Sequence, residues 1–302
     1  MMNERKLRYI MEIAKEGNIT TAAQNLFISQ PSLSNFLLSV EEELGAKLFD
    51  RSVSPMILTY AGEKYIAAAE KIIGTLQELQ HQIDDMNDTL TGRLHIGCGT
   101  QQSPFLIPAI LPILMDRFPG IQFRLFENSW DVLEEHLLNG TLDLILYGRR
   151  VTHPNIEYIG LSEDEMVLLA PPSFQPKHTK RKDGRIFPCV ELHALGSIPF
   201  VLMNRVHQLR AFQDRIFQEY HYEPNVILET DNWLTCLLMV ESGIAFTILP
   251  NAKIDLDTGR VGKYSFEHEH TRQTILCYRK NSYFPKILQA FINVACEALR
   301  RE

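Results

Sequence analysis

The chain has 302 residues, of which 45% are hydrophobic and 22% are charged. This is the composition of a globular protein, and the length exceeds one typical domain of about 100–200 residues, so we expect two or three compact units. No apolar run approaches the ~20 residues of a membrane helix, and charges stand among the first ten residues, where a secretory signal would be apolar. We therefore expect a cytoplasmic protein that does not enter a membrane.

The charge distribution gives no general signal for nucleic-acid binding. The net charge is −7, and residues 1–90 contain 8 Lys and Arg against 13 Asp and Glu. Because phosphate binding needs Lys and Arg that face the duplex, the bulk charge argues against a nucleic-acid partner. Any DNA-binding surface must therefore be identified from its motif.

The cysteines do not form a recognisable framework. The chain has five cysteines, which is an odd number, and they are widely spaced without any CxxC. This pattern predicts reduced and mostly buried thiols rather than disulfides or a zinc knuckle. They are Cys98, Cys189, Cys236, Cys277 and Cys296.

The first sixty residues predict three short helices. The first has an apolar face at helical spacing and ends before Asn18, which can cap a second helix over residues 20–26. Ser29 can cap a third helix, Pro31 suits its first turn, and Gly45 supplies a left-handed stop. The apolar face of the first helix consists of Leu7, Ile10, Met11 and Ala14.

The third predicted helix has an apolar face and a short polar one. Its inward residues are Leu33, Phe36, Leu37, Val40 and Leu44, and its outward residues are Gln30, Ser32, Ser34 and Asn35. Short polar side chains at a helix start can approach base edges and phosphates in a major groove. Three capped helices also form ordinary helical subdomains, so this pattern alone leaves DNA binding open.

Residues 48–49 and 57–59 flank a loop and predict a two-stranded wing in which Arg51 can contact a phosphate. The stretch ITTAAQNLFISQPSLSNFLLSVEEELGAKLFDRS, followed by LTYAG, resembles the winged helix-turn-helix of LysR-type transcriptional regulators over a long, ungapped match. The family implies double-stranded operator DNA with two-fold-related half-sites and RNA polymerase as partners. The resemblance implies a DNA-facing surface of Ser29, Gln30, Pro31, Ser32, Ser34 and Asn35, with Thr20 and Arg51 near the DNA backbone.

The sequence departs from the family pattern in two places. Asn35 stands where the family often has Arg, and Ser54 and Ile57 stand where its wing is often basic. Asn pairs best with adenine and Arg with guanine, so we expect a different base preference opposite Asn35 and fewer phosphate contacts from the wing.

A heptad seam follows the wing, with apolar residues at alternating spacings of four and three. The seam consists of Tyr65, Ala69, Ile72, Leu76, Leu79, Ile83, Met86 and Leu90. Such a seam is typical of a helix that pairs with a second copy, and the resembling family uses this helix for dimerisation. We expect a homodimer or homotetramer held by Ile72, Leu76, Leu79 and Ile83, although packing within one chain would use the same stripe.

Residues beyond 90 alternate apolar strands with amphipathic helices in two similar rounds. The first round has strands at 93–98, 121–126 and 142–147 and helices at 103–118 and 130–138. The second has strands at 199–203, 225–229 and 243–249 and helices at 209–220 and 233–240. This alternation predicts two parallel α/β lobes, connected near residues 161–166 and 250–266, with a last strand and helix at 273–299 returning to the first lobe.

The landmarks GRLHIG, LP, FP and LDLIL make this region similar to the periplasmic-binding-protein-like (type 2) effector domain of the same family. We therefore predict a multidomain protein with an all-α winged helix-turn-helix head, a long linker helix and a two-lobed α/β effector domain. The predicted boundaries are 1–60 for DNA binding, 61–90 for the linker and dimerisation helix, and 91–302 for the effector domain. Lobe I would span 91–164 and 266–302, and lobe II 165–265.

A cleft between such lobes collects polar turn residues that follow the strands. The predicted effector-binding residues are Thr100, Gln101, Gln102, Ser103, Asn128, Ser129 and Tyr147 from lobe I, and Asn204, His207, Thr230 and Thr247 from lobe II. Each is as compatible with a helix cap or a loop hydrogen bond. Because helix starts favour anions, we expect the effector to be a small anionic or zwitterionic metabolite.

An enzyme and a solute-binding protein are the two other classes that the two-lobed pattern allows. An enzyme is disfavoured because Gly97-x-Gly99 lacks the third glycine of a dinucleotide fingerprint and no GxSxG elbow occurs. His268 and His270 flank a glutamate without a nearby third ligand, so we expect no catalytic residue, no metal and no cofactor. A solute-binding protein would fit the two lobes alone, but not the preceding DNA-binding pattern.

Overall fold

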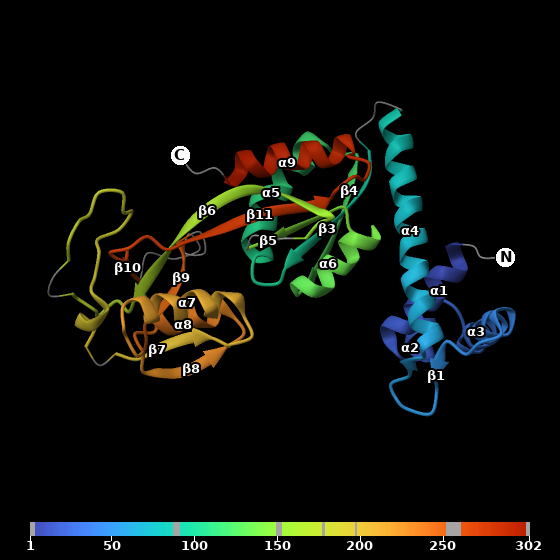
Figure 1. Cartoon of the computed structure of the whole chain (residues 1–302), viewed down its shortest axis with the longest axis horizontal. Coiled ribbons are helices and arrows are strands. Elements are labelled where there is room, and N and C mark those ends of the chain that lie inside the picture. The colour runs from blue at the N-terminus through green and yellow to red at the C-terminus, as the bar shows by residue number, and fades with distance from the viewer. Residues whose placement is uncertain are drawn as a thin grey trace.

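The computed structural model of the chain describes residues 4–86, 91–148, 153–176, 179–196, 198–251 and 261–299. Figure 1 shows a helical head at the N-terminus, one upright helix beside it, and an elongated α/β body of two lobes. Within these residues, no helix is both long and apolar enough to cross a membrane.

The head contains three helices and a small hairpin. The helices are α1 (Glu4–Glu16), α2 (Ile19–Asn25) and α3 (Gln30–Leu44), and the antiparallel strands are β1 (Phe49–Asp50) and β2 (Ile57–Leu58). The predicted caps are confirmed: Asn18 accepts from the Thr20 N–H, Ser29 accepts from the Ser32 N–H, and Gly45 ends α3 at φ 67°. Buried side chains of all three helices, among them Leu7, Ile10, Ala22 and Leu33, form one core.

Helix α4 (Tyr60–Met86) leaves the head as 27 uninterrupted residues. The predicted seam divides along it, because Tyr65 and Ala69 are buried in the core of the head, against α1, in the same chain. Ile72 and the later seam residues lie beyond that core. Packing within one chain, the alternative that the sequence left open, therefore accounts for Tyr65 and Ala69. Leu90 lies outside the described residues.

Lobe I is a sheet with helices on both faces. Parallel strands β3 (Gly92–Gly99), β4 (Ile121–Asn128) and β5 (Leu144–Tyr147) are joined on the β5 side by antiparallel β11 (Thr271–Arg279). Helices α5 (Ser103–Arg117) and α9 (Lys286–Leu299) cover one face, and α6 (Trp130–Asn139) covers the other. Alternate residues of β5 point to opposite faces of the sheet. Leu144 and Leu146 pack on the side of α5 and α9, and Ile145 packs on the side of α6.

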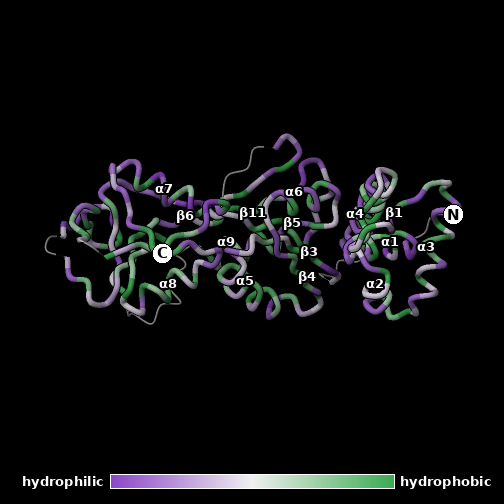
Figure 2. Tube along the Cα trace, turned by 90° about the horizontal axis from the view of Figure 1, so that it is seen from below, coloured by the Kyte–Doolittle hydropathy of each residue, from purple (hydrophilic) through white to green (hydrophobic). Residues whose placement is uncertain are grey.

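Lobe II repeats the arrangement on a smaller scale. Parallel strands β7 (Phe200–Met203) and β8 (Val226–Thr230) are covered by α7 (Gln208–Glu219) and α8 (Trp233–Glu241). Strands β9 (Thr247–Pro250) and β10 (Gly262–Tyr264) pair antiparallel with β6 (Ile156–Ala170). Figure 2 shows hydrophobic segments along the central strands of the body and hydrophilic ones on its outer turns.

The two lobes share strands instead of being joined by loops. Strand β6 runs for 15 residues without a break, pairing first with β11 and then with β9 and β10, as Figure 1 shows. The sequence predicted a connection at residues 161–166, because the charged run there hides the period of two. The expected parallel lobes are correct for the sets β3–β5 and β7–β8, and Phe246, just before β9, forms a parallel bridge with Phe200 of β7. The pairs of β6 with β9, β10 and β11 add antiparallel pairing that the sequence did not indicate.

The cysteines are free thiols, as the sequence predicted. All are buried except Cys296, which is partly exposed. Burial raises the pKa of Cys98 and raises that of Cys277 to about 12, so both stay protonated near neutral pH and pack as small apolar residues.

Candidate DNA-binding surface and effector cleft

The start of α3 presents polar side chains to solvent. Gln30, Pro31, Ser32 and Asn35 are exposed, and Ser34 is half-buried beside them. The hydroxyl of Ser29 lies 2.7 Å from that of Ser32, so part of its hydrogen-bonding capacity serves the helix cap. Thr20 is exposed on α2, where its backbone N–H is bonded to the preceding cap.

Arg51 of the wing is held by the buried end of α3. Its guanidinium lies 3.1 Å from a carboxylate oxygen of Glu41, a fully buried side chain that also accepts from the Leu48 N–H at 2.8 Å. A guanidinium carries five N–H donors, so this ion pair fixes the direction of the side chain and leaves donors for another anion. The wing is thereby tied to the helix that precedes it.

Helix α4 presents its apolar seam to solvent within the single chain. The exposed fractions are 39% for Ile72, 41% for Leu76, 50% for Leu79 and 43% for Ile83. A groove of about 630 Å³ runs beside these residues, with Arg8 of α1 and Arg93 of β3 among its walls. Large apolar side chains repeated along one helix face are typical of an interface.

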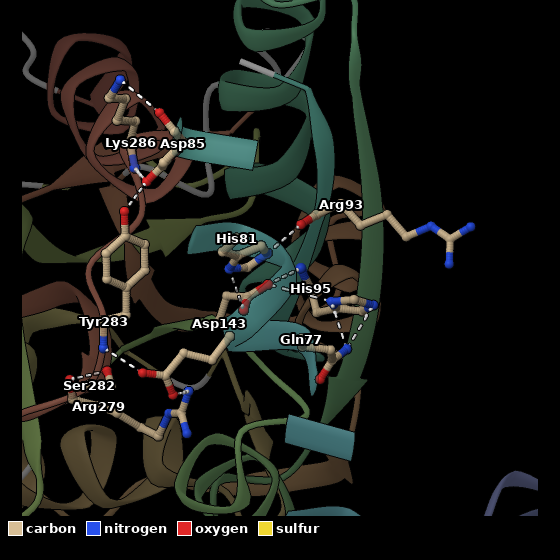
Figure 3. Close-up of polar contacts among 11 residues, drawn as sticks. Gln77, His81, Asp85, Arg93, His95, Asp143, Arg279, Ser282, Tyr283 and Lys286 are labelled. Carbon is tan, nitrogen blue, oxygen red and sulfur yellow. Dashed lines mark hydrogen bonds and ion pairs between the residues drawn. The ribbon is translucent and has the colours of Figure 1, made fainter. Parts of the chain in front are cut away.

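The opposite face of α4 is docked on lobe I (Figure 3). His81 is buried, and its Nε2 lies 2.9 Å from the carbonyl oxygen of Arg93. The amide nitrogen of Gln77 lies 3.2 Å from Nδ1 of His95, whose backbone N–H donates to Asp143 at 2.6 Å. Strand β3 and Asp143, which precedes β5, thus hold one face of the helix.

A second cluster, also drawn in Figure 3, fixes the far end of α4. The carboxylate of Asp85 accepts from the Tyr283 hydroxyl at 2.7 Å and from the Lys286 N–H at 3.0 Å. Glu78 accepts from the Tyr283 N–H at 2.9 Å and lies 3.7 Å from the Arg279 guanidinium. The hydrogen bond to Asp85 raises the pKa of Tyr283, which keeps the hydroxyl a donor.

Gly74 allows α4 and α6 to cross closely. A Cβ on Gly74 would lie 2.2 Å from the carbonyl oxygen of Asn139 and 2.8 Å from the Cα of Gly140. Gly→Ala inside a helix normally stabilises by about 1 kcal/mol. Here we expect Gly74→Ala to destabilise by about 1–3 kcal/mol, because backbone atoms must separate.

Thermal unfolding of the full chain measures this effect, with Ala68→Gly on an exposed part of α4 as the control for helix propensity. The control should lose about 1 kcal/mol. A higher Tm for Gly74→Ala than for the wild type would contradict the docking of α4 on lobe I.

A cleft of about 510 Å³ lies where the two lobes meet. Lobe I contributes Gly99, Thr100, Gln101, Gln102, Asn128, Ser129, Trp130, Asp131 and Tyr147. Lobe II contributes Val206, His207, Gln208 and Leu209, and Arg272 comes from the shared strand β11. The lining therefore combines the first turns of α5, α6 and α7 with one buried cation.

The structure brings seven of the eleven predicted effector-binding residues to this cleft and leaves four outside its lining: Ser103, Asn204, Thr230 and Thr247. Thr247 is fully buried inside lobe II, because β9 is covered on both sides. Ser103 is buried and bonded to Cys98, and Asn204 donates to Asp231 at 2.6 Å. The Thr230 hydroxyl accepts from the Asn232 N–H, which is a local turn contact.

The lobes touch each other beside the cleft. The amide of Gln101 donates to the carbonyl oxygen of Asp231 at 2.7 Å, and the rings of Phe105 and Trp233 lie 4.3 Å apart. The Asp231 carboxylate also bonds His207 at 2.8 Å, and hydrogen bonds from Asn204 and His207 lower its pKa. These contacts place the start of α7 next to the turn after β3.

Arg272 is a buried cleft residue that the sequence did not single out. It is 6% exposed, its Nε donates to the Gly148 carbonyl at 3.0 Å, and burial lowers its pKa to about 10. It therefore stays protonated near neutral pH. The last strand was predicted to begin at Gln273, two residues after the actual start of β11 at Thr271, and an arginine inside an apolar strand is the signal that could have identified it.

Among the described residues, no group of three or more His, Cys, Asp or Glu side chains is arranged to hold a metal ion. The rings of His268 and His270 lie 6.0 and 6.1 Å from the ring of Tyr220, whose hydroxyl accepts from the His268 N–H at 2.8 Å.

Comparison with known proteins agrees with this organisation. The model for the bacterial regulatory helix-turn-helix protein of the lysR family matches residues 5–63, and the model for the LysR substrate binding domain matches residues 87–300. Two regulators of Bacillus subtilis (strain 168) are similar throughout. YcgK is 27% identical, covering 99% of this chain and 96% of its own, and BsdA is 26% identical, covering 97% and 100%.

The structure of full-length CbnR complexed with its target DNA is 21% identical, has a TM-score of 0.70, and covers 98% of this chain and 100% of CbnR. That likeness concerns the fold. The matches of the family models to both parts of the sequence show that the chain belongs to the LysR family of DNA-binding transcriptional regulators, with a substrate-binding domain after its helix-turn-helix.

Proposed function

We propose that this regulator changes its operator binding when a small anionic or zwitterionic metabolite binds between the two lobes. One observation carries the proposal. The N-cap residues of the three helices that start at the cleft, α5, α6 and α7, make no side-chain capping hydrogen bond. By contrast, α2, α3 and α8 are capped by their own side chains.

Uncapped helix starts favour a bound anion. The first N–H groups of a helix have no partner within it, and their partial positive charge is stabilised by a carboxylate or phosphate. Three such starts around one cleft of about 510 Å³ give a small anion several donors. Thr100, exposed at the turn after β3, adds a hydroxyl.

For DNA, we infer that the exposed start of α3 enters the major groove. Gln30, Ser32 and Asn35 would meet base edges, with Ser29, Pro31 and Ser34 packed close to the duplex. Thr20 and Arg51 would contact phosphates on either side. The complex of CbnR with its target DNA shows that a protein of this fold binds DNA as a full-length chain.

For assembly, we infer that the exposed seam of α4 pairs with the same helix of a second copy, giving a homodimer or a homotetramer. Pairing would cover Ile72, Leu76, Leu79 and Ile83, and would place two heads over two-fold-related half-sites. RNA polymerase would be the partner through which a bound regulator affects transcription.

The linkage between cleft and DNA follows from the docking of α4. Because α4 is bonded to lobe I through His81, Glu78 and Asp85, a change in the angle between the lobes moves lobe II relative to the helix that carries the head. A ligand shifts this equilibrium only by its differential affinity for the two arrangements, typically about 1–3 kcal/mol.

The proposal is tested by screening the full chain for thermal stabilisation by a metabolite library, followed by gel shifts on the DNA upstream of its own coding sequence. A ligand at 100 times its Kd stabilises by about 2.7 kcal/mol, which is readily measured. We expect stabilising acids to change operator affinity by about 5- to 150-fold. Stabilising ligands that leave operator affinity unchanged would contradict the proposal.

Thr100 gives a sharper test within the cleft. Thr100→Val is nearly isosteric and removes only the hydroxyl, so operator affinity without ligand should stay as in the wild type. The effector midpoint should rise by about 10-fold, as expected for one lost hydrogen bond to a charged group. Operator binding across an effector titration measures this midpoint, and an unchanged midpoint would mean that the effector does not contact Thr100.

A further inference from the structure

A single positively charged side chain forms part of the effector cleft. Among the described residues that line it, Arg272 is the one with a cationic group, and Asp131 is the one with a carboxylate. Arg272 is buried, whereas Asp131 is exposed at the first turn of α6. The cation therefore belongs to the inner wall of the cleft and the anion to its mouth.

Arg272 is held by strands that both lobes share. It stands on β11 opposite Asp164 of β6, and its Nε donates to the carbonyl of Gly148. Gly148 also makes space for it, because a Cβ there would lie 2.3 Å from the Nη2 atom. Because residue 148 has no side chain, the guanidinium of Arg272 packs directly against its backbone, and this contact fixes the direction of the guanidinium.

The neighbouring residues narrow the space around the guanidinium. Tyr147 precedes Gly148 on the cleft wall, and its ring stacks edge-on against Trp130 at 5.1 Å. Gln102 is buried, and a Cβ added to Gly99 would lie 2.1 Å from its Oε1. An aromatic and an amide side chain thus flank the guanidinium on the cleft wall.

We propose that Arg272 is the anchor for a carboxylate group of the effector, which it binds through two parallel N–H···O hydrogen bonds. This proposal rests on the proposed function, since it places the effector in the same cleft. The rigid fork of a guanidinium matches the two oxygens of a carboxylate, and the pair gains strength where water is excluded. Because Arg272 lies opposite the point where β6 passes from one lobe to the other, the anchored group lies between the lobes.

The chemistry of this wall distinguishes an acid from its neutral analogue. A primary amide has the shape of a carboxylate but presents an NH₂ group to a donor, so one of the two hydrogen bonds is replaced by a repulsive contact. Removing the acceptor leaves a buried cation facing a donor. Acid–amide pairs therefore report on Arg272 without knowledge of the natural effector.

The experiment measures dissociation constants of the full-length protein by calorimetry for two such pairs, butyrate with butyramide and benzoate with benzamide. The wild type should bind at least one acid about 10- to 100-fold more tightly than its amide. Arg272→Met, which keeps an apolar chain of similar length, should reduce that preference to less than about twofold. Arg272→Lys should retain part of it, because charge remains but the fork is lost.

Gly148→Ala keeps the charge and displaces the guanidinium, so it tests the geometry if Arg272→Met does not fold. We expect it to lower the acid preference about 10-fold. A wild type without preference for either acid would overturn the proposal, as would a preference retained in both Arg272→Met and Gly148→Ala.

The same measurements separate this proposal from the function on which it rests. If a neutral ligand changes operator binding and depends on Thr100, the regulator senses through the cleft and the arginine anchor is wrong. If an acid binds through Arg272 and leaves operator binding unchanged, the anchor holds and the proposed sensing function is wrong.

Discussion

Ser34→Glu should abolish specific operator binding by the full-length protein, with a loss of affinity of at least about 100-fold. Ser34 is half-buried at the second turn of α3, beside the exposed Gln30 and Asn35. A glutamate there would bring a bulky negative charge against the phosphates and would hold the helix away from the base edges. Gel shifts with operator and scrambled duplexes at one salt concentration measure the loss.

Ser39→Glu is the matched control, because Ser39 is exposed further along the same helix. It adds the same charge away from the helix start and should change operator affinity by less than about 10-fold. Thermal unfolding and ligand stabilisation should stay as in the wild type for both variants. Wild-type operator affinity in Ser34→Glu would remove the assignment of α3 as the recognition helix.

Leu76→Glu should convert the oligomer into monomers. Leu76 lies in the middle of the exposed seam, at the wall of the groove beside α4. In a two-fold assembly each substitution places an unpaired charge in an apolar interface, at a cost of several kcal/mol per ion. Sedimentation equilibrium of the full chain measures the change in mass, and operator affinity should fall with it because half-sites are no longer held in pairs.

Thr75→Glu serves as the control for Leu76→Glu. Thr75 is the preceding exposed residue of α4 and lies off the seam, and its hydroxyl donates to the Lys71 carbonyl of its own helix. The same glutamate there should leave the oligomer intact. An unchanged oligomer for Leu76→Glu would mean that the copies associate through another surface.

The sequence predicted the head well because its signals are local. Asn18, Ser29 and Gly45 act within a few residues of their own positions, and the structure shows the two caps and the left-handed stop there. Phe27, in the turn before α3, has a φ of 56° and is 95% exposed, which its apolar character alone does not indicate.

The body was harder to predict because its decisive contacts join distant segments. Charged, outward-facing residues conceal the strand pattern of β6 in the sequence. The full length of this strand is visible only from its pairing with β9, β10 and β11. Thr247 lies within the predicted strand 243–249, and nothing local shows that it is fully buried. Arg272 reaches the cleft only through pairing with Asp164, more than 100 residues earlier.

The docking of α4 on lobe I also depends on contacts between segments that are distant in the sequence. A heptad pattern predicts which face is apolar, but the polar face carries the contacts of His81 and Asp85 to lobe I, and polar residues have no periodic signature. The close crossing at Gly74 is likewise visible only when Asn139 is placed beside it.

Footprinting of the full-length protein on the DNA upstream of its own coding sequence, with and without a stabilising acid, tests the central claim most directly. We expect protection of two half-sites about one helical turn, or a multiple of it, apart, with a spacing or extent that changes when the acid is added. Protection spread evenly along the fragment, equal on scrambled DNA and indifferent to the acid, would contradict the account.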